Sequence, residues 1–417
     1  MTMPLLPPRR KNPLLRTQQI NLPPQARSRV ALGLTAAAAE GRLELQVCSD
    51  CASVQYPPRE ACHHCLSPRL RWRPQSGEGV LLGATTLHHS NDPFFRERLP
   101  WRLGLVRLTA GPALLVHLHG EVGEAPAPVQ VGVRLDRAGQ AVLIGLPRER
   151  SEHMADDRML REMTSNPKFR KVLVTDGKSA VGQAIVRALV ESGADLVWVG
   201  HAEPWKKPPG FADLGSLPQV TPVPLDLSNG RSVSELAGEI GGKVDIVVNN
   251  ADVHRTCGIA ARPGTDVARA EMEINYFGLL RLAQAFGPPL KARSADGVTH
   301  ACAWVNLLSI YALSNYPPHG TYSASKAAAL SLSQCLRAEL QPAGIRVIHL
   351  FPGPIDDEWN QNLPPPKLAA AAIAAAVVEA LREGVEDVYP GEVAQEWLER
   401  WRDNPKVLER ELAAGGH

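Results

Sequence analysis

The chain has few aromatic residues, little net charge and no long hydrophobic run, and each absence excludes a class of protein. Phe, Trp and Tyr make up 5 % of the 417 residues, and the formal net charge at pH 7 is +2. So balanced a charge argues against general nucleic-acid binding, which relies on a strongly basic surface. The longest apolar run, Leu368 to Val378, is too short to span a bilayer. We therefore expect neither a nucleic-acid partner nor a membrane segment.

The start of the chain lacks acidic residues, because the first one is Glu40. The basic residues ahead of it are Arg9, Arg10, Lys11, Arg16, Arg27 and Arg29. This proline-rich beginning is either a solvated tail or a partner-binding arm. It lacks the apolar core of a secretory signal, and its prolines break the amphipathic helix that an organellar transit peptide needs. We expect a cytoplasmic protein.

The chain has 7 cysteines, and their spacing divides them into two groups. Two Cys-x-x-Cys pairs, separated by ten residues, consist of Cys48, Cys51, Cys62 and Cys65. Such pairs form knuckles that place four thiolates around one zinc ion, and a closed thiolate sphere makes that zinc structural rather than catalytic. His63 and His64 lie inside the second pair and could replace a ligand, although we expect them to be solvated. A disulfide framework is the alternative, but no secretory context supports it. The remaining cysteines are scattered singly, as core thiols usually are: Cys257, Cys302 and Cys335.

Short β-rich segments with Gly and Pro between them follow the cysteine pairs. They lie at 80–89, 103–108, 113–119, 129–135 and 140–145, and five strands of this length predict a small barrel, which is OB-like by the resemblance given below. Such barrels bind single-stranded nucleic acid where a basic groove carries exposed aromatic rings, but the charge here is balanced. Phe94, Phe95 and Trp101 cluster in one loop, where they either pack between ribbon and barrel or form a docking surface.

The cysteine pairs and the strands after them resemble the zinc-ribbon plus OB-fold proteins that accompany acyl-CoA thiolases and related aldolases. The resemblance covers residues 25–147. It implies that this module docks to a thiolase-fold partner, and it points to an acyl-CoA thioester as the substrate.

A second domain begins after a charged segment, 148–170, which shows no hydrophobic period and is predicted to be a linker. Near-continuous apolar runs follow at 171–175, 196–200, 244–249, 303–309 and 345–351. Such runs are typical of parallel strands buried on both faces. Because helix-like segments alternate with them, we predict an α/β domain with a Rossmann-like, doubly wound parallel sheet. The predicted divisions are a tail at 1–24, a helix and zinc ribbon at 25–75, a barrel at 76–147, the linker, the α/β domain at 171–395 and a C-terminal helix or tail at 396–417.

A proton-transfer site is predicted where the apolar run 303–309 ends and the next helix begins. Tyr322 and Lys326 are four residues apart, so on a helix they share one face. An ammonium group there favours the phenolate and lowers the tyrosine pKa from its free value of about 10, which makes the tyrosine usable as an acid or base. Ser309 ends the strand and is placed to hold the same substrate oxygen.

A larger set of residues resembles the short-chain dehydrogenase/reductase family over residues 170–395. The residues that carry the resemblance are Ser309, Tyr322, Lys326, Asn249, Asn250, Ala251, Pro352 and Gly353. In that family the tyrosine exchanges the alcohol proton, the serine holds the carbonyl oxygen, and the lysine contacts the cofactor ribose. Asn275 falls where the family places an asparagine that holds a water feeding the lysine. The resemblance implies hydride transfer with NAD or NADP.

The nucleotide-binding turn departs from that family. A short-chain dehydrogenase has Thr-Gly-x-x-x-Gly-x-Gly, whose glycines let the backbone approach the pyrophosphate at a helix N-terminus. Thr175 and the last glycine, Gly182, match this pattern. Asp176 and Ala180 replace the other two glycines, and Gly177 restores some flexibility one position late.

Other cofactor positions match the family better. The resemblance assigns Asp226 and Leu227 to the adenine ring, Asn250 and Ala251 to the ribose side, and Pro352, Gly353 and Ile355 to the nicotinamide loop. The family's Asn-Asn-Ala-Gly turn ends here in Asp252 instead of glycine. The second strand ends at Gly200 and is followed by His201, without the acid that holds the 2′-hydroxyl of NAD. This favours NADP, with Lys206 and Lys207 as phosphate partners unless both merely solvate a loop.

The two resemblances together predict an NAD(P)-dependent enzyme that interconverts 3-hydroxyacyl-CoA and 3-oxoacyl-CoA, because the ketone is what a thiolase cleaves. The alternative is a non-catalytic scaffold whose dehydrogenase-like half pairs with an active homologue and whose zinc half supports a thiolase. By the resemblance, helices that begin near Val267 and Tyr322 form the interface of a homo- or hetero-oligomer. We expect the segment Asp356 to Pro365 to form part of a substrate lid.

Overall fold

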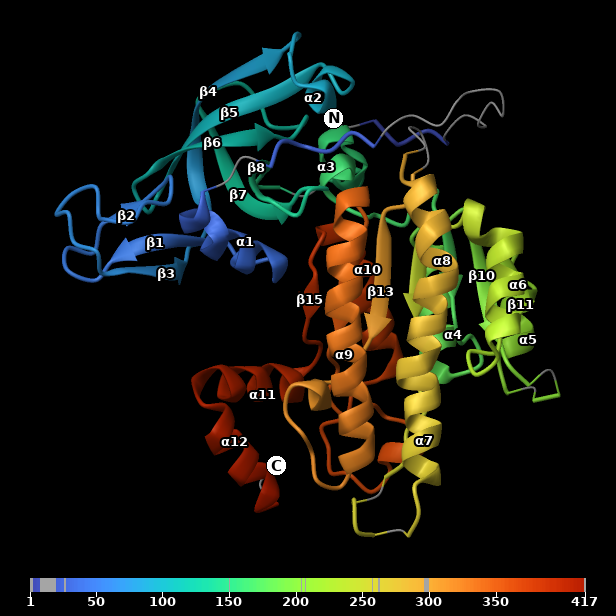
Figure 1. The fold of residues 1–417 in the computed structure, drawn as a ribbon. Coiled ribbons are helices and arrows are strands. Elements are labelled where there is room, and N and C mark those ends of the chain that lie inside the picture. The colour runs from blue at the N-terminus through green and yellow to red at the C-terminus, as the bar shows by residue number, and fades with distance from the viewer. Residues whose placement is uncertain are drawn as a thin grey trace. The chain divides into compact units, whose positions relative to one another are not determined.

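The fold is known from a computed structural model of the chain. The structure describes residues 3–7, 20–25, 28–149, 151–203, 205–206, 208–256, 258–261, 263–295 and 300–415. Two compact units make up the chain, one built mainly from residues up to Asn166 and one mainly from Pro167 onward, and each is described by itself (Figure 1). Most of the predicted basic tail, together with Cys257 and Lys207, lies outside the described residues.

The first unit begins with a short helical segment and a three-stranded ribbon. The helical elements are η1 (Arg29–Ala31) and α1 (Leu32–Ala39), and the strands are β1 (Glu44–Cys48), β2 (Val54–Gln55) and β3 (Leu70–Pro74). The strands are antiparallel in the order β2-β1-β3. Gly33 of α1 lies against Trp72 of β3, where an added Cβ would stand 2.1 Å from the indole nitrogen. Glycine at this position therefore lets the helix pack closely on the ribbon.

A closed barrel of five strands follows, in the order β4-β5-β6-β8-β7. The strands are β4 (Glu78–Leu87), β5 (Trp101–Leu108), β6 (Ala113–Leu118), β7 (Ala127–Leu135) and β8 (Ala141–Pro147). Side chains alternate between the inside and the outside of the barrel, and Leu81, Val106, Leu114 and Val129 fill its interior. The predicted five-stranded barrel is confirmed.

The aromatic side chains of the barrel loop are packed rather than displayed. Phe94, on α2 (Pro93–Arg96), is fully buried, and the ring of Phe95 lies edge-on to that of Trp101 at 5.4 Å. Trp101 Nε1 donates to His117 Nδ1 at 2.8 Å. Phe95 and Trp101 pack with barrel residues and a helix that follows the barrel, not between ribbon and barrel as one expectation had it. Phe94 and Trp101 are too buried to act as the docking surface that the other expectation proposed.

The segment predicted to be a linker is partly folded. It contains η2 (Met154–Asp156) and α3 (Arg158–Met163), and Asp157 caps α3 by accepting from the Leu160 amide. Met159, Leu160 and Met163 are buried in one cluster with Trp101. The expectation that this segment buries no apolar face is therefore wrong, because three apolar side chains fall on one side of a short helix that is otherwise charged.

The second unit is built on a seven-stranded parallel sheet in the order β11-β10-β9-β12-β13-β14-β15. The strands are β9 (Lys171–Val174), β10 (Leu196–His201), β11 (Val220–Pro224), β12 (Ile246–Asn249), β13 (Ala303–Leu307), β14 (Arg346–Leu350) and β15 (Asp387–Val388). The strand order reverses between β9 and β12, and ligands of such sheets bind at the carboxyl ends beside that reversal. The predicted doubly wound sheet is confirmed.

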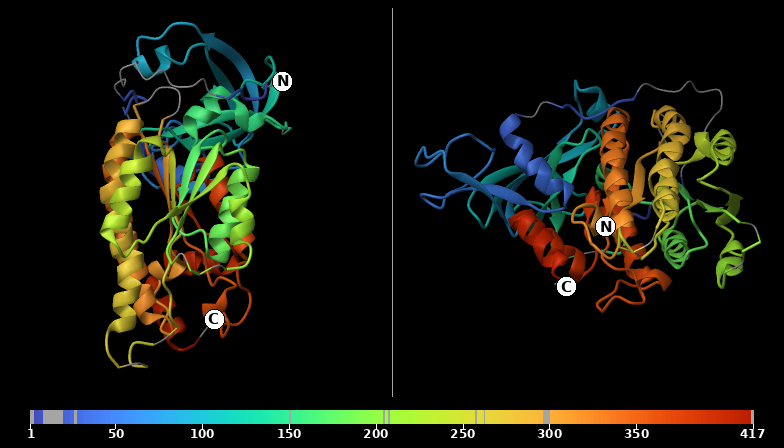
Figure 2. Two further views of the ribbon diagram at one scale, coloured as in Figure 1. Left: turned by 90° about the vertical axis from the view of Figure 1, so that its right-hand side faces the viewer. Right: turned by 60° about the horizontal axis from the view of Figure 1, so that its bottom comes forward.

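Helices cover both faces of this sheet, with α8 and α9 on one face and α4 on the opposite one (Figure 2). The longer helices are α4 (Ala180–Glu191), α6 (Gly230–Ile240), α8 (Leu279–Arg293), α9 (Gly320–Leu340), α10 (Ala370–Glu383), α11 (Glu392–Asp403) and α12 (Pro405–Ala413). The shorter elements are α5 (Phe211–Gly215), η3 (Gly241–Lys243), α7 (Asp266–Met272), η4 (Glu273–Gly278), η5 (Ile310–Ala312), η6 (Gln341–Ala343) and η7 (Glu358–Asn360). None of the helices that the structure describes is both long enough and apolar enough to cross a membrane.

Candidate active site and metal centre

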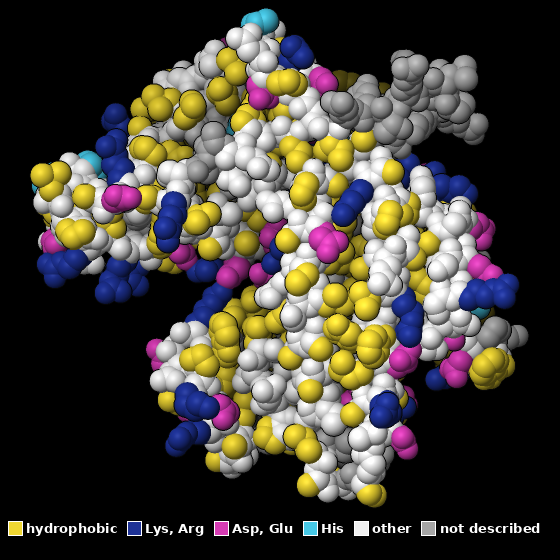
Figure 3. All heavy atoms as spheres, in the orientation of Figure 1, with side chains coloured by type: hydrophobic (Ala, Val, Ile, Leu, Met, Phe, Trp, Pro, Cys, Tyr) yellow, Lys and Arg dark blue, Asp and Glu magenta, His cyan; other side chains and the backbone are white. Residues whose placement is uncertain are grey.

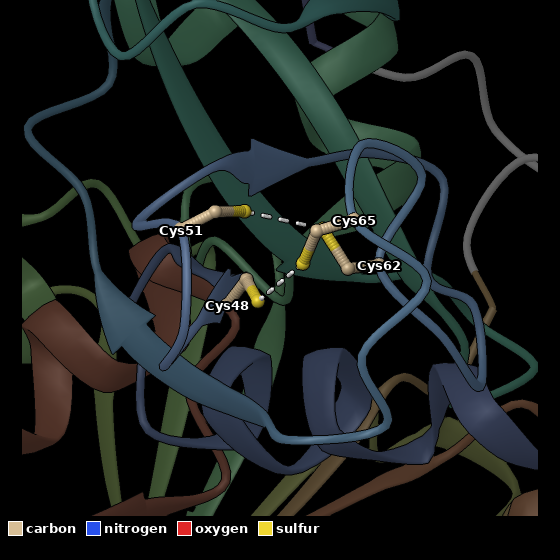
Figure 4. A group of neighbouring side chains, drawn as sticks. All are labelled: Cys48, Cys51, Cys62 and Cys65. Carbon is tan, nitrogen blue, oxygen red and sulfur yellow. Dashed lines mark hydrogen bonds between the residues drawn. The ribbon is translucent and has the colours of Figure 1, made fainter.

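The four predicted zinc ligands lie together at one end of the ribbon (Figure 4). The sulfur atoms of Cys48, Cys51, Cys62 and Cys65 are all within 4.8 Å of one another. The Cys48–Cys65 and Cys51–Cys62 sulfur pairs are each 3.6 Å apart. Zinc bonds to sulfur at about 2.3 Å, so a tetrahedral site needs sulfur atoms separated by about 3.8 Å. The cluster therefore has the dimensions of a closed zinc site.

The two cysteine loops repeat the same backbone conformation. Ala52 and Leu66, which directly follow the second cysteine of each pair, have left-handed φ values of 58° and 63°. The amide of Ala52 donates to the Cys48 carbonyl and that of Leu66 to the Cys62 carbonyl, both at 3.0 Å. A strained conformation that occurs twice at equivalent positions indicates loops shaped to present thiolates.

The backbone of each loop also stabilises the charged form of one thiol. The amides of Cys51 and Asp50 point at the Cys48 sulfur and lower the pKa of that thiol to about 6. The Cys65 amide, in the same way, lowers the pKa of Cys62. Because the thiolate is the metal ligand, this stabilisation of Cys48 and Cys62 favours metal binding.

The second site centres on Tyr322 and Lys326, which lie one turn apart on α9. Both side chains are buried, with 5 % and 2 % of their surface exposed. The Lys326 ammonium lies 5.5 Å from the centre of the Tyr322 ring and donates to the Leu307 carbonyl at 3.1 Å. The structure therefore brings the two residues together at the carboxyl end of β13, as their spacing predicts.

A carboxylate pairs with this lysine. Lys326 Nζ lies 2.8 Å from Asp252 Oδ1, and the Tyr322 hydroxyl donates to Asp252 Oδ2 at 3.4 Å. Burial raises the pKa of Tyr322 well above its ordinary value, and Asp252 raises it further. The expectation of a lowered tyrosine pKa is wrong for this structure, because burial, together with the Asp252 carboxylate, raises the pKa instead.

Ser309 and Asn275 are buried near the same strand ends. Ser309 caps η5 by accepting from the Tyr311 amide at 3.2 Å. Asn275 lies in η4, a π-helical turn of the kind that often marks functional sites. Its side chain donates to the Val253 carbonyl and to Ser325 Oγ and accepts from the Val253 amide, each at 2.9 Å. Asn275 thus ties the loop that carries Asp252 to α9.

Two histidines complete the surroundings of the tyrosine, and neither was identified from the sequence. The His254 ring stacks on Tyr322 with 4.0 Å between ring centres. His254 Nε2 is hydrogen-bonded to Nδ1 of His319, whose Nε2 is buried without a hydrogen-bond partner among the described residues. Burial lowers the pKa of each histidine to about 4, so both are neutral at pH 7. The only sequence signal was that His319 precedes Tyr322 by three positions, which is one helical turn.

An aromatic wall borders the same tyrosine. Tyr311 lies edge-on to Tyr322 at 6.4 Å, stacks on Tyr316 at 5.2 Å and contacts Trp397 of α11 at 5.5 Å. Trp397 is 4 % exposed, so the C-terminal segment predicted as a helix or tail packs beside the site.

The turn after β9 is tied to the end of β12. Thr175 Oγ1 accepts from the amides of Asn250 and Ala251 at 3.1 and 3.2 Å. The Asn250 side chain in turn accepts from the Asp176 amide at 3.0 Å and donates to the Asp176 carbonyl at 2.7 Å. These bonds fix the turn opposite the loop that ends in Asp252.

The two glycines of this turn cannot be replaced without displacing neighbours. An added Cβ at Gly177 would stand 1.8 Å from Val199 Cγ1, and one at Gly182 would stand 1.8 Å from the Asp176 carbonyl oxygen. Asp176 Oδ1 accepts from the Lys178 amide at 3.0 Å, and burial raises the pKa of the carboxyl. The side chain at the lost glycine is therefore folded into the turn, directly before α4 begins.

The remaining predicted cofactor residues lie at the neighbouring strand ends. Asp226 accepts from the Ser228 amide at 2.9 Å, and the side chain of Leu227 is buried. His201 ends β10, and burial lowers its pKa. Pro352 and Gly353 are buried after β14, and Ile355 forms a β-bridge with Leu368.

One cation beside His201 was missed from the sequence. Lys178 Nζ donates to the carbonyls of Ala202, at 2.7 Å, and of Glu203. It therefore reaches from the phosphate turn to the end of β10. Lys206, one of the predicted phosphate partners, lies in the loop that follows.

Comparison with known proteins divides the chain in the same way. Residues 170–367 match the family model described as short chain dehydrogenase. Residues 35–71 match the ChsH2 rubredoxin-like zinc ribbon domain, and residues 72–140 match the ChsH2 C-terminal OB-fold domain.

A short-chain dehydrogenase from Burkholderia cenocepacia J2315, solved in complex with NADP, is 35 % identical with a TM-score of 0.53 and covers 59 % of this chain and 98 % of its own. An uncharacterized oxidoreductase of Staphylococcus aureus (strain USA300) is 31 % identical over 217 residues, which are 51 % of this chain and 90 % of that protein. The chain belongs to the short-chain dehydrogenase family. Mouse dehydrogenase/reductase SDR family member 7B is 31 % identical over 214 residues, which cover 49 % of this chain but only 64 % of that protein's length.

This short-chain dehydrogenase therefore carries N-terminal ChsH2-type zinc-ribbon and OB-fold domains, and its fold retains the backbone features that suit a dinucleotide. Gly177 and Gly182 leave no side chain at the turn, and Ser179 caps the N-terminus of α4 there. The Asp176 carboxylate accepts from the Lys178 amide and is held within the turn. The residues present fit the cofactor that the family implies.

Purified protein should contain about one zinc ion per chain, because four thiolates close one coordination sphere. Cys62→Ser should lose the metal and unfold the ribbon, whereas Cys335→Ser, which removes an exposed free thiol, should keep it. Metal analysis of the three proteins decides the matter. Equal zinc content in wild type and Cys62→Ser would contradict the assignment.

Proposed function

We propose that this short-chain dehydrogenase interconverts 3-hydroxyacyl-CoA and 3-oxoacyl-CoA with NADP, and that its N-terminal module docks to a thiolase-fold partner. The observation that carries the proposal is the buried set of Tyr322, Lys326 and Ser309 at the carboxyl ends of the central strands, in a chain that also bears ChsH2-type domains. A bound nicotinamide would supply or accept the hydride.

The chain's own residues divide the remaining work. Tyr322 exchanges a proton with the substrate oxygen, and Ser309 holds that oxygen by a hydrogen bond. Lys326 fixes the carboxylate that touches the tyrosine and would contact the cofactor ribose. The turn with Gly177 and Gly182, and the N-terminus of α4, would hold the pyrophosphate.

NADP is favoured over NAD by the charges at the end of β10. His201 stands where an acid would hold the 2′-hydroxyl of NAD, and the Lys178 ammonium lies against the next two carbonyls. A lysine ammonium at this position favours a phosphate through a charge-assisted hydrogen bond. The relative from Burkholderia cenocepacia, solved with NADP, supports the same preference.

The substrate class follows from the fused modules and from the loop over the site. A ketone beside a thioester is what a thiolase cleaves, so a carbinol dehydrogenase joined to a thiolase-docking module is chemically coherent. The segment predicted to be a lid contains η7, and Trp359 of η7 contacts two residues that follow β12. Thr256 Oγ1 donates to the Trp359 carbonyl at 2.6 Å, and the Arg255 guanidinium lies 3.9 Å from the Trp359 ring centre. These contacts hold the segment predicted to be a lid to the loop after β12.

The partner proposal is supported by an apolar stripe on the outer face of the barrel. Its members are Val80, Leu82, Leu105 and Leu115, which are between 42 % and 61 % exposed. Leu105 pairs directly with Leu115 across β5 and β6, and Gly83 next to Leu82 pairs with Leu105 across β4 and β5. Figure 3 also shows apolar side chains gathered on this face of the barrel. A contiguous patch of exposed apolar side chains marks an interaction surface more often than single exposed apolar residues do.

Wild-type protein should reduce a short 3-oxoacyl-CoA faster with NADPH than with NADH, and Tyr322→Phe should lower the rate at least about 10²-fold. Only a hydroxyl is removed, so folding should be unchanged by circular dichroism. Leu412→Met, a buried change in α12, serves as a control and should keep the rate. Equal measurable rates in wild type and Tyr322→Phe would contradict the role of Tyr322. No turnover by wild type would favour a scaffold, for which two acidic residues in the cofactor region, Asp176 and Asp252, are the specific observation.

The apolar stripe should be needed for capture of a thiolase-fold protein. Leu105→Lys with Leu115→Lys places two charges in the interface, and each buried charge costs several kcal/mol, on the order of 2–5. Tagged wild type should therefore retain a thiolase-fold protein, identified by mass spectrometry, that the double variant loses. Val407→Lys, at a residue 49 % exposed on α12, is the matched control and should retain it. Retention by all three proteins would rule the stripe out as the contact.

A further inference from the structure

Asp252 occupies a place in the site that the family gives to glycine. It follows Asn249, Asn250 and Ala251 at the end of β12, so its backbone lies at the carboxyl edge of the central sheet. Its two carboxylate oxygens are divided between the two residues of α9 that the family uses for proton transfer. Oδ1 lies 2.8 Å from Lys326 Nζ, and Oδ2 accepts from the Tyr322 hydroxyl at 3.4 Å.

The position of this carboxylate is held from several sides. Asn275 binds both backbone polar groups of the next residue, Val253, at 2.9 Å. The ring of His254 stacks on Tyr322, which fixes the loop against the phenol. Asp252 therefore meets the tyrosine through a braced loop rather than as a free surface side chain.

The charges that face Tyr322 come from several elements. They are Lys326 on α9, Asp252 and His254 after β12, Tyr311 on η5, His319 before α9 and Asp357 before η7. Burial keeps both histidines neutral at pH 7, with a pKa of about 4 each. Asp357 is engaged with the amides of Trp359 and Asn360 at 3.0 Å, which leaves Asp252 as the carboxylate in contact with the phenol among the described residues.

The ion pair changes the conditions under which the Tyr322 phenol can transfer a proton. With its ammonium committed to Asp252 and to the Leu307 carbonyl, Lys326 no longer stabilises a phenolate. Tyr322 is therefore held as a phenol in a buried site. A phenol gives a proton readily only if another group replaces that proton, and it accepts one only if its own proton can leave.

We propose that Asp252 is a catalytic residue that exchanges the phenolic proton of Tyr322 while Tyr322 exchanges a proton with the substrate oxygen. The proposal rests on the dehydrogenase function proposed above. It assigns to this chain a carboxylate-ended relay in place of a lysine-activated tyrosine.

The relay balances in both directions. During alcohol oxidation the hydroxyl proton of the substrate passes to Tyr322 Oη, and the phenolic proton passes to Asp252 Oδ2. The carbon–hydrogen bond breaks with its electron pair, for which a bound oxidised nicotinamide dinucleotide would supply the hydride acceptor, and the O–H pair becomes the carbonyl π bond. Asp252 then releases its proton to water, since its side chain is 29 % exposed whereas that of Lys326 is 3 % exposed. Ketone reduction reverses each transfer.

The direct test measures tyrosine ionisation in the protein without substrate or cofactor, by ultraviolet difference titration. Asp252→Asn keeps the shape of the side chain but removes its charge, which frees Lys326 to stabilise the phenolate. The pKa of free tyrosine is about 10. Below that pH, Asp252→Asn should show one more titrating tyrosine than the double variant Asp252→Asn/Tyr322→Phe. Wild type and Tyr322→Phe should coincide over that range.

Controls separate the charge effect from a change of fold. Asp357→Asn removes the other carboxylate near the phenol but leaves the Lys326 pair, so it should show no additional tyrosine. Asp252→Gly restores the residue found in the family. It also removes the charge, so it serves as a second test if the asparagine side chain of Asp252→Asn disturbs the loop. An additional tyrosine in neither Asp252 variant would overturn the proposal, and this result does not depend on whether wild type turns over substrate.

The pH profile of alcohol oxidation supplies the second arm in protein that is active. The oxidation rate of wild type should rise little between pH 7 and alkaline pH, because Asp252 takes the phenolic proton. Asp252→Asn should lose about 10²-fold at pH 7 and regain rate toward alkaline pH, and Asp252→Glu should restore part of it. An Asp252→Asn profile that matches wild type would overturn the relay, whereas inactivity of wild type itself would overturn the proposed function.

Discussion

The ion pair between Lys326 and Asp252 is the constraint on which the chemistry of the second unit depends. It joins α9 to the loop after β12 at the carboxyl edge of the sheet, in surroundings where Lys326 is 2 % exposed. A buried ammonium without a partner is costly. Removing the Asp252 carboxylate would therefore leave the Lys326 ammonium in need of another partner. The phenol of Tyr322, in contact with the same carboxylate, is the group best placed to respond.

In the turn after β9, too, an acidic side chain that replaces a family glycine is held by local bonds. Asp176 stands where the family has glycine, yet its carboxylate accepts a backbone amide and so does not face outward. Gly177 and Gly182 keep the close approaches that the turn requires. Local bonds therefore engage both acidic side chains, and the N-terminus of α4 and Lys178 would offer positive charge to the phosphates of a bound dinucleotide. In the zinc ribbon, too, local backbone bonds stabilise charged side chains: loop amides favour the thiolates of Cys48 and Cys62, which a metal would bind.

Much of the fold could be predicted because its signals are local. Buried parallel strands appear as apolar runs, and cysteine spacing alone brings Cys48, Cys51, Cys62 and Cys65 within bonding range of one ion. Signals that arise between distant segments could not be predicted. The helix α3 looked like a linker because the residues that bury it belong to the barrel. The net shift of the Tyr322 pKa was predicted with the wrong sign, because both the burial of the phenol and the meeting of Asp252 with α9 depend on the tertiary fold.

In the function proposed here, the altered turn and the acidic loop still form a dinucleotide site. Calorimetric titration of the purified wild-type chain with NADPH tests this site without a substrate or a partner. We expect saturable binding of about one NADPH per chain below about 1 mM, and weaker binding of NADH. No measurable binding of either dinucleotide at that concentration would contradict a dinucleotide site and leave a scaffold as the function.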